Sequence, residues 1–355
     1  MRKMTGLRLA ALATAALATA ALAMLSGCAR QSPGAPGAAA SGAPATPSTA
    51  PLRIGLVAKS LGNGFFDAVH KGGDEAAREL GGVQIIFTGP TTPTAEGQIE
   101  VLDALIAQHV DAIAVSANDP DALVPTLRKA MQRGIKVLSY DSAVAPEGRI
   151  VHLAPSSDPL IGDTCLQLAA AAAPKGQGQA AILSATPTST NQNAWIGAMQ
   201  AAAPRYPALK IIATVYGDDL SDKSYRETVA LLKRYPDLAV IIAPTSVGIV
   251  AAAKAVEDEH LTGKVYVTGL GLPSEMAGHV HAGSVKSFAI WNPIDLGYSV
   301  VQLAVQLVHG ARGGPGATLS IGRMGQVTFD AAGSGPMGKP FTYDAANVAQ
   351  FAAVF

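Results

Sequence analysis

From Leu52 onward, short apolar runs rich in β-branched residues alternate with longer amphipathic segments. The apolar runs have the length of buried strands, and the amphipathic segments have the length of helices. This alternation predicts an α/β fold in which helices cover both faces of parallel sheets. The predicted strands are LRIGLVA, VQIIF, AIAVS, KVLSYD, AAILSA, KIIATVY, AVIIAP, VYVTGL and KSFAIW, and helices are predicted over 66–80, 96–108, 121–133, 222–234 and 247–259.

The length of this pattern indicates two lobes. A stretch of about 300 residues is too long for one such core and suits two. The alternation restarts near 151–157, in VHLAPSS. We therefore expect two doubly wound parallel-sheet lobes that meet near this point.

The N-terminal segment has the features of a secretory leader. Three of its first eight residues are basic, and an uncharged Ala/Leu stretch follows over 9–25. That stretch is shorter than the ~20 apolar residues of a membrane-spanning helix, which argues against a transmembrane anchor. The next residues, LSGC, resemble a bacterial lipobox, in which the cysteine is lipidated and becomes the mature N-terminus. We expect residues 1–27 to be a lipoprotein signal peptide, and Cys28 to anchor an extracytoplasmic protein to the membrane.

Composition agrees with an exported chain. Residues 28–51 are mostly Ala, Pro, Gly and Ser and are expected to form a flexible tether, because they bury too little apolar area to offset the entropy of ordering. Without the leader, 23 basic and 26 acidic residues give a net charge of −3, so there is no basic field to attract nucleic acid. Cys165 lies in an apolar run, and we expect it to be a small core residue.

The ends of the predicted strands carry the side chains that indicate a binding site. In open parallel sheets, ligands bind beyond the carboxyl ends of the strands. Polar groups beside flat aromatic rings suit a small polyhydroxylated ligand, because the rings cover its C–H faces and the polar groups bind its hydroxyls. The candidate ligand-binding residues are Lys59, Asn63, Phe65, Phe66, Asn118, Asp119, Asp141, Asn191, Gln192, Trp195, Pro244, Ser246 and Trp291.

The stretch VAKSLGNGFF predicts a tight strand-to-helix turn at the rim of this site. Gly62 and Gly64 permit the positive φ and the close backbone approach that such a turn requires. The two phenylalanines then fall at the start of the helix, where one packs inward and the other faces the ligand. Lys59 is expected to donate to a ligand hydroxyl and to balance Asp141 in part; an ordinary surface charge is the competing interpretation.

Other residues have competing structural interpretations. Trp195 lies in an amphipathic segment and also suits an ordinary core position, whereas Trp291 precedes Asn-Pro and is the better stacking candidate. Asp218, Asp219 and Asp222 lack the ligand spacing and the turn glycine of an EF-hand loop, so we interpret them as a helix-start region. The histidines form no HExxH-type set, and neither a metal nor a cofactor is expected.

Several segments together resemble the sugar-binding proteins of bacterial ABC importers, in the rhamnose-binding and autoinducer-2-binding branch. The resemblance runs from about Arg53 to the C-terminus. It implies two α/β lobes joined by three crossing strands, with a small sugar clamped between them for delivery to an ABC permease and its ATPase. The matching segments are VAKSLGNGFF, VSANDPDALVPTLRKAMQRGIKVLSYDS, STNQNAW, IIAPTSVGIVAAAKAVED, TGLGLPSEMAGHV and FAIWNPIDLGYS.

The resemblance also implies where the chain crosses between lobes. The crossings are expected near 153–156, 291–294 and 322–327. One lobe would then comprise 52–154 plus 294–321, and the other 155–293 plus 322–355.

Within this branch, the site residues imply a particular ligand. Autoinducer-2 receptors bind through a lysine, an aspartate, an Asp-Gln pair and a Pro-x-Ala segment; Lys59, Asp141, Gln192 and Pro244 match those positions. Asn191 stands in place of the aspartate of the pair and Ser246 in place of the alanine. Asn191 can donate as well as accept a hydrogen bond, and Ser246 adds a hydroxyl. With these changes the site is more similar to that of the rhamnose-binding members, which carry a comparable TNQN and APTSVG. The resemblance therefore favours L-rhamnose, with autoinducer-2 or another deoxysugar as the alternative.

The motifs of other functional classes are missing from the sequence. No G-x-S-x-G elbow, Walker loop or complete G-x-G-x-x-G follows a predicted strand. A sugar-responsive repressor would need an N-terminal helix-turn-helix, where this sequence predicts a leader. A sugar-modifying enzyme of the cell surface is the remaining alternative from a different class. We expect a monomeric binding protein and not an enzyme.

Overall fold

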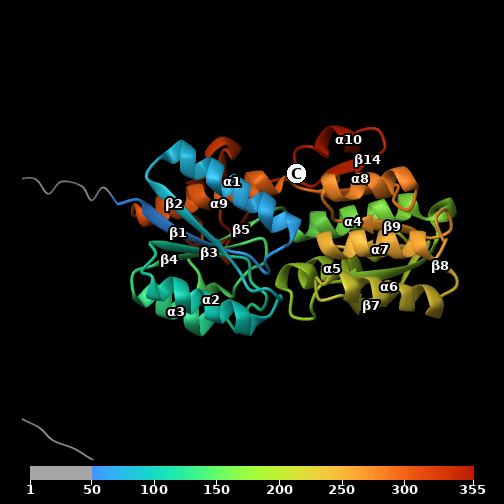
Figure 1. Ribbon diagram of the computed structural model, residues 1–355, viewed down its shortest axis with the longest axis horizontal. Helices are drawn as coiled ribbons and strands as arrows, with labels where there is room; N and C mark the ends of the chain where they lie inside the picture. Colours follow the sequence, from blue (N-terminus) through green and yellow to red (C-terminus); the bar gives the residue numbers. More distant parts are fainter. Residues whose placement is uncertain (1–49) are drawn as a thin grey trace, which may run out of the picture. The chain divides into compact units, whose positions relative to one another are not determined.

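The structure is a computed structural model that describes residues 50–355 (Figure 1). The predicted signal peptide (1–27), the predicted lipidation site at Cys28 and all but the last two residues of the predicted tether lie outside the described residues. Over 50–355, no helix is both long and apolar enough to cross a membrane.

The first lobe is built on a six-stranded parallel sheet in the order β13-β5-β4-β3-β1-β2. Its central strands, β1, β3 and β4, are almost fully buried, as expected when helices cover both faces of a parallel sheet. The strands are β1 (Leu52–Val57), β2 (Val83–Thr88), β3 (Ala112–Val115), β4 (Lys136–Tyr140), β5 (Val151–Ala154) and β13 (Ser334–Pro336); the helices are α1 (Gly64–Leu80), α2 (Ala95–Ala107), α3 (Val124–Gln132) and α9 (Pro293–Val308).

The second lobe has a four-stranded parallel sheet in the order β7-β6-β8-β9, extended by single bridges from β9 and the residue after it toward β10. β10 in turn pairs antiparallel with β14. The strands are β6 (Gly178–Ser184), β7 (Leu209–Tyr216), β8 (Leu238–Ala243), β9 (Tyr266–Gly269), β10 (Ser287–Ile290) and β14 (Phe341–Asp344); the helices are α4 (Asp158–Ala172), α5 (Thr190–Ala202), α6 (Ser221–Arg234), α7 (Ser246–Asp258), α8 (Pro273–Ala282) and α10 (Val348–Phe351). The two sheets confirm the predicted fold class.

The chain passes between the lobes after β5, after β10 and after β13. The third passage differs from the predicted crossing at 322–327. That segment instead contains β12 (Gln326–Thr328), which pairs with β11 (Thr318–Ser320), and β13 then joins β5 in the first sheet. The chain therefore reaches the second lobe only with β14, later than predicted.

Close packing of α1 against α9 joins two segments far apart in sequence (Figure 1). A Cβ atom placed on Gly72 would lie 1.8 Å from the carbonyl oxygen of Ile294, and one placed on Gly297 would lie 1.9 Å from that of Val69. Only glycine permits this approach of the two backbones. The contact attaches α9 to the first lobe directly after the chain has left β10.

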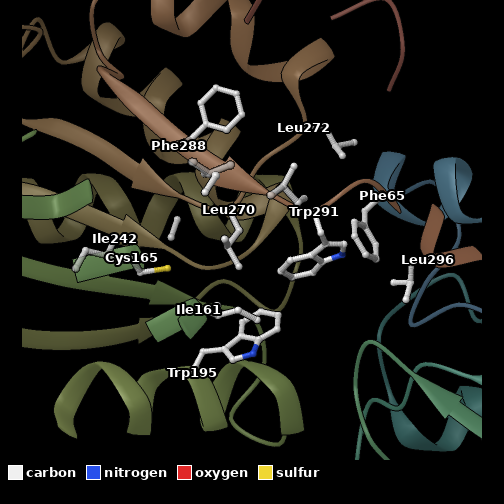
Figure 2. Packing of buried hydrophobic residues seen from close by; sticks show 14 of the residues in the cluster. Phe65, Ile161, Cys165, Trp195, Ile242, Leu270, Leu272, Phe288, Trp291 and Leu296 are labelled. Carbon is white, nitrogen blue, oxygen red and sulfur yellow. The ribbon is translucent and has the colours of Figure 1, made fainter. Parts of the chain in front are cut away.

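The second lobe has a dense apolar core around α4 (Figure 2). Cys165 is fully buried there, and burial raises the pKa of its thiol to about 12. The sequence-based expectation of a small core residue is therefore correct. The same cluster extends through Trp291 to Phe65, so apolar packing is continuous from one lobe to the other.

Candidate ligand-binding site

A cavity lies between the two lobes, next to the carboxyl ends of their parallel strands; it has about 380 Å³ of empty space when the part open to solvent is included. All of the predicted ligand residues line it except Asn118 and Asp119. Four lining residues were not predicted. The lining comprises Lys59, Asn63, Phe65, Phe66, Asp141, Asn191, Gln192, Trp195, Asp219, Pro244, Thr245, Ser246, Leu270, Ile290 and Trp291.

The turn after β1 has the predicted form. Gly62 has a φ of 76° and lets the chain reverse, while Gly64 begins α1 with a negative φ. A Cβ on Gly64 would lie 2.6 Å from the Glu275 carboxylate of the second lobe, so this glycine permits close approach between the lobes. Asn63 caps α1 by accepting a hydrogen bond from the Phe65 backbone N–H at 3.0 Å.

Asn118 and Asp119 bind backbone groups of the surrounding loops and do not line the cavity. The Asn118 side chain donates to the carbonyl oxygens of Lys59 (2.8 Å) and Thr94 (3.2 Å). Asp119 Oδ1 accepts from the backbone N–H groups of residues 121 and 122. The structure thus places these two predicted ligand residues in the loop that supports Lys59.

Lys59 reaches from the first lobe to the second. Its side chain is buried, and its Nζ donates to Ser189 Oγ at 2.8 Å and to Asn191 Oδ1 at 2.9 Å. The competing interpretation of a surface charge is therefore wrong. Burial lowers the pKa of Lys59, while the nearby carboxylates of Asp141 and Asp219 raise it.

Asp141 is held rigidly at the end of β4. Its Oδ2 accepts from Ser116 Oγ at 2.8 Å, and its Oδ1 accepts from Asn191 Nδ2 at 3.0 Å. Its φ of 55° lies in the left-handed region, which costs energy for a residue with a side chain. Burial raises the pKa of this carboxyl, and Lys59 opposes that rise.

Gln192 is oriented by its own lobe. Its Oε1 accepts from the Ala185 backbone N–H at 2.6 Å and from Ser184 Oγ at 2.8 Å. Because the oxygen is occupied by these donors, the amide NH₂ is the part of the side chain that can serve a ligand. This arrangement makes Gln192 a hydrogen-bond donor to the cavity.

Aromatic rings form the other wall of the cavity. Phe65 lies edge-to-face with Phe66, at 5.2 Å between ring centroids. It also lies edge-to-face with Trp291 at 6.1 Å, and Trp291 lies 5.7 Å from Trp195 (Figure 2). Trp195 Nε1 donates to Asp158 Oδ1 at 3.0 Å, whereas the buried Trp291 Nε1 has no partner within residues 50–355. Both phenylalanines line the cavity, in contrast to the expectation that one would turn away.

The residues that sequence reasoning missed lie at strand ends like the others. Thr245 lies between two predicted residues. Leu270 follows β9 and Ile290 ends β10; both belong to apolar runs, so the sequence does not distinguish them from ordinary core residues. Asp219 follows β7 by three residues. Its position after a strand of the second sheet is the signal that could have identified it, since it was interpreted as part of a helix start.

Comparison with known families identifies related sequences. A family model described as "Periplasmic binding protein domain" matches residues 54–312. The D-ribose/D-allose-binding protein of Pseudomonas aeruginosa is 28% identical over 229 residues, which cover 61% of this chain and 70% of that protein.

Solved structures give a closer match. An ABC transporter solute binding protein from Clostridium phytofermentas, with bound L-rhamnose, is 36% identical with a TM-score of 0.81, covering 86% of this chain and 99% of that one. LsrB from Clostridium saccharobutylicum, in complex with AI-2, has a TM-score of 0.80 at 20% identity, covering 84% of this chain and 99% of that one. At that identity, the likeness to LsrB shows the fold alone.

Proposed function

Because this chain belongs to the periplasmic binding protein family, we propose that it captures L-rhamnose outside the cytoplasm and delivers it to the permease and ATPase of an ABC importer. The chain is a binding protein and not an enzyme, as its sequence indicated; the alternative of a sugar-modifying enzyme is therefore excluded. The relative at 36% identity, which contains bound L-rhamnose, supports the choice of sugar.

The observation that carries the proposal is the division of the cavity into a polar and an apolar side. Lys59, Asp141 and Gln192 present charged and amide groups that suit sugar hydroxyls. Leu270 and Ile290 add an aliphatic surface next to the Trp291 indole. A 6-deoxyhexose has hydroxyls for the first surface and a methyl group for the second, so it fits both.

Hinge closure, the established motion of periplasmic binding proteins, would couple binding to delivery. Lys59, Asp141 and Phe65 belong to the first lobe, whereas Gln192, Ser246 and others belong to the second. A ligand that contacts both groups stabilises the closed state, because only in that state does it contact both lobes. The permease would then receive the closed, loaded protein.

The membrane attachment is part of the same proposal. Lipidation at Cys28, followed by the tether over 28–51, would hold a monomer close to the permease. Autoinducer-2 or another deoxysugar is the second candidate, because Lys59, Asp141, Gln192 and Pro244 all match the positions that autoinducer-2 receptors use and all line the cavity.

Thermal unfolding of the purified full-length chain tests which ligand it binds. L-rhamnose, other hexoses, pentoses and autoinducer-2 are added in turn, and a ligand at about 100 times its dissociation constant adds roughly 2.7 kcal/mol of stability. A selective rise in the unfolding temperature with L-rhamnose supports the proposal. A rise with autoinducer-2 alone replaces it by the second candidate, and no rise with any sugar contradicts it.

Two aspartates at strand ends provide a matched pair of variants. Asp141→Ala removes a charged acceptor from the cavity and is expected to weaken L-rhamnose binding by about 1.5–3 kcal/mol. Asp119→Ala removes a loop carboxylate that does not line the cavity, so we expect the affinity to stay unchanged. Equal affinities for the two variants would remove Asp141 from the binding site.

A further inference from the structure

Asp219 lies in a backbone turn whose conformation is unusual for its residues. Asp218 and Asp219 have φ values of 55° and 50°, so two consecutive residues with side chains occupy the left-handed region. Such conformations cost energy and persist where the surrounding structure enforces them, often at functional sites. The turn directs the two carboxylates differently: Asp218 forms an ion pair with Lys223, and Asp219 lines the cavity.

A hydrogen bond fixes the Asp219 carboxylate at the end of another strand. Its Oδ1 accepts from Thr245 Oγ1. Thr245 Oγ1 in turn accepts from the backbone N–H of Gly248 at 3.2 Å and so caps α7. Asp219 is thereby held by a rigid helix start, with one carboxylate oxygen occupied and the other left for the cavity.

The cavity carries more negative than positive charge. Within the described part of the chain, its ionisable lining groups are Lys59, Asp141 and Asp219. Lys59 directs its Nζ to Ser189 Oγ and Asn191 Oδ1. One ammonium group therefore stands beside two carboxylates, which come from opposite lobes.

We propose that Asp219 contacts the ligand and determines its charge class. Its free carboxylate oxygen accepts a ligand hydroxyl from the side of the second lobe, while Asp141 faces the ligand from the first. The excess negative charge selects uncharged sugars and excludes uronates and sugar phosphates, because a further anion in a poorly solvated cavity is repelled by the unpaired carboxylate. This inference rests on the proposed capture of a sugar and specifies the class of sugar.

Isothermal titration of the full-length chain tests the role of Asp219. The probes are L-rhamnose and three matched pairs of a hexose with its uronate, from glucose, galactose and mannose. Asp219→Asn removes the charge, keeps the shape and suits the left-handed backbone; Asp218→Asn is the matched control, since it makes the same change in the same turn. We expect Asp219→Asn to weaken L-rhamnose binding by about ten- to a hundredfold.

The control variant is expected to bind L-rhamnose within about threefold of the parent, because its carboxylate lies outside the cavity. No uronate should bind the parent as tightly as its neutral hexose. Asp219→Glu keeps the charge and displaces the carboxylate, so it should bind L-rhamnose more weakly and still discriminate against uronates. It also serves as the test if Asp219→Asn does not fold.

The outcomes separate this inference from the proposed function. If the parent binds L-rhamnose and the Asp219 variants bind it equally well, the role of Asp219 is disproved and sugar capture stands. If a uronate binds the parent as tightly as the matched hexose, the charge rule is disproved. If no sugar binds the parent, sugar capture is contradicted and the inference is lost with it.

Discussion

Lys59 Nζ lies 2.9 Å from Asn191 Oδ1, so a buried side chain of the first lobe is hydrogen-bonded to the second lobe inside the cavity. Asn191 in turn donates from Nδ2 to Asp141 Oδ1 on the first lobe at 3.0 Å. The chain Lys59–Asn191–Asp141 thus crosses between the lobes and returns. Because the same side chains line the cavity, ligand contact and lobe closure depend on one set of groups.

Replacing Lys59 by methionine tests this arrangement. The change removes both inter-lobe hydrogen bonds of Lys59 and leaves Asp141 and Asp219 without a cation. We expect the free energy of unfolding to fall by about 3 kcal/mol, since a buried charge that loses its partner is strongly destabilising. Sugar binding should be lost in the same variant. Urea unfolding and calorimetry measure the two effects.

Lys71→Met is the matched control for that variant. Lys71 lies on α1 and its Nζ donates to the carbonyl oxygen of Val354 at an exposed position. The free energy of unfolding should change by no more than about 0.5 kcal/mol. If both methionine variants unfold like the parent, the buried network of Lys59 does not stabilise the fold.

The ionisation of Asp219 predicts a stability change that depends on pH. Burial raises the pKa of this carboxyl more than Lys59 and the Thr245 hydrogen bond lower it. A carboxyl whose pKa is raised on folding stabilises the fold below its unfolded pKa, and that stabilisation is lost as the pH rises through the folded pKa. We therefore expect Asp219→Asn to be more stable than the parent at pH 7, and the difference to disappear near about pH 4.

Urea unfolding at several pH values checks the sign of this effect. Asp218→Asn should differ little from the parent at pH 7, because a partly exposed ion pair contributes about 0–1 kcal/mol. A loss of stability at pH 7 on Asp219→Asn would contradict the expectation. If Asp219→Asn is more stable than the parent at pH 7 and also binds the sugar more weakly, the protein retains a destabilising carboxylate for ligand recognition.

The site residues at strand ends were predicted well because the topology of each sheet brings its own strand ends together. Once parallel strands are recognised, their carboxyl ends must share one edge of their sheet, so Lys59 and Asp141 could be placed together. Gln192 follows a strand of the other sheet, and the resemblance to two-lobed sugar-binding proteins placed it in the same site. Asn118 and Asp119 also follow a parallel strand, yet they do not line the cavity. Asn118 donates to carbonyl oxygens of two neighbouring loops, and Asp119 accepts from backbone N–H groups of its own loop; such competition for a side chain is not visible in a strand pattern.

The missed residues could be distinguished from their neighbours only with information that the folded backbone contains. Asp219 faces the cavity and Asp218 does not, a difference set by two left-handed φ angles in adjacent, identical residues. Leu270 has the same apolar character as the core and becomes a lining residue only through position. The crossing was misplaced because β13 is a three-residue Ser-Gly-Pro strand with low β-propensity, recognisable only by its pairing with β5.

The two tryptophans of the cavity provide a comparison between a partnered and an unpartnered N–H group. Trp195 Nε1 donates to the Asp158 carboxylate, and Trp291 Nε1 has no partner among residues 50–355. We expect Trp195→Phe to be less stable than Trp291→Phe by about 1.5–3 kcal/mol, the value of a hydrogen bond to a charged group. The two changes remove similar volumes, so urea unfolding isolates the hydrogen bond.

The same pair should differ in the opposite direction in ligand binding. Trp291 lines the cavity, so Trp291→Phe removes part of the indole surface that would cover the sugar, and affinity for L-rhamnose should fall by about fivefold to tenfold. Trp195→Phe retains the contacts of the sugar with Trp291, and we expect a smaller loss. A larger loss of affinity in Trp195→Phe would contradict the expectation that Trp291 is the main aromatic contact of the sugar.

The contact between α1 and α9 gives a prediction about the fold itself. In Gly72→Ala the new Cβ would lie 1.8 Å from the Ile294 carbonyl oxygen, so the helices must separate. We expect the free energy of unfolding to fall by about 3 kcal/mol or more, as for severe overpacking. Gly278→Ala on α8 meets no atom within 4 Å and should gain about 0.5–1 kcal/mol from helix propensity. Urea unfolding of both variants tests this prediction. A similar gain in the free energy of unfolding in both would show that α1 and α9 do not approach so closely.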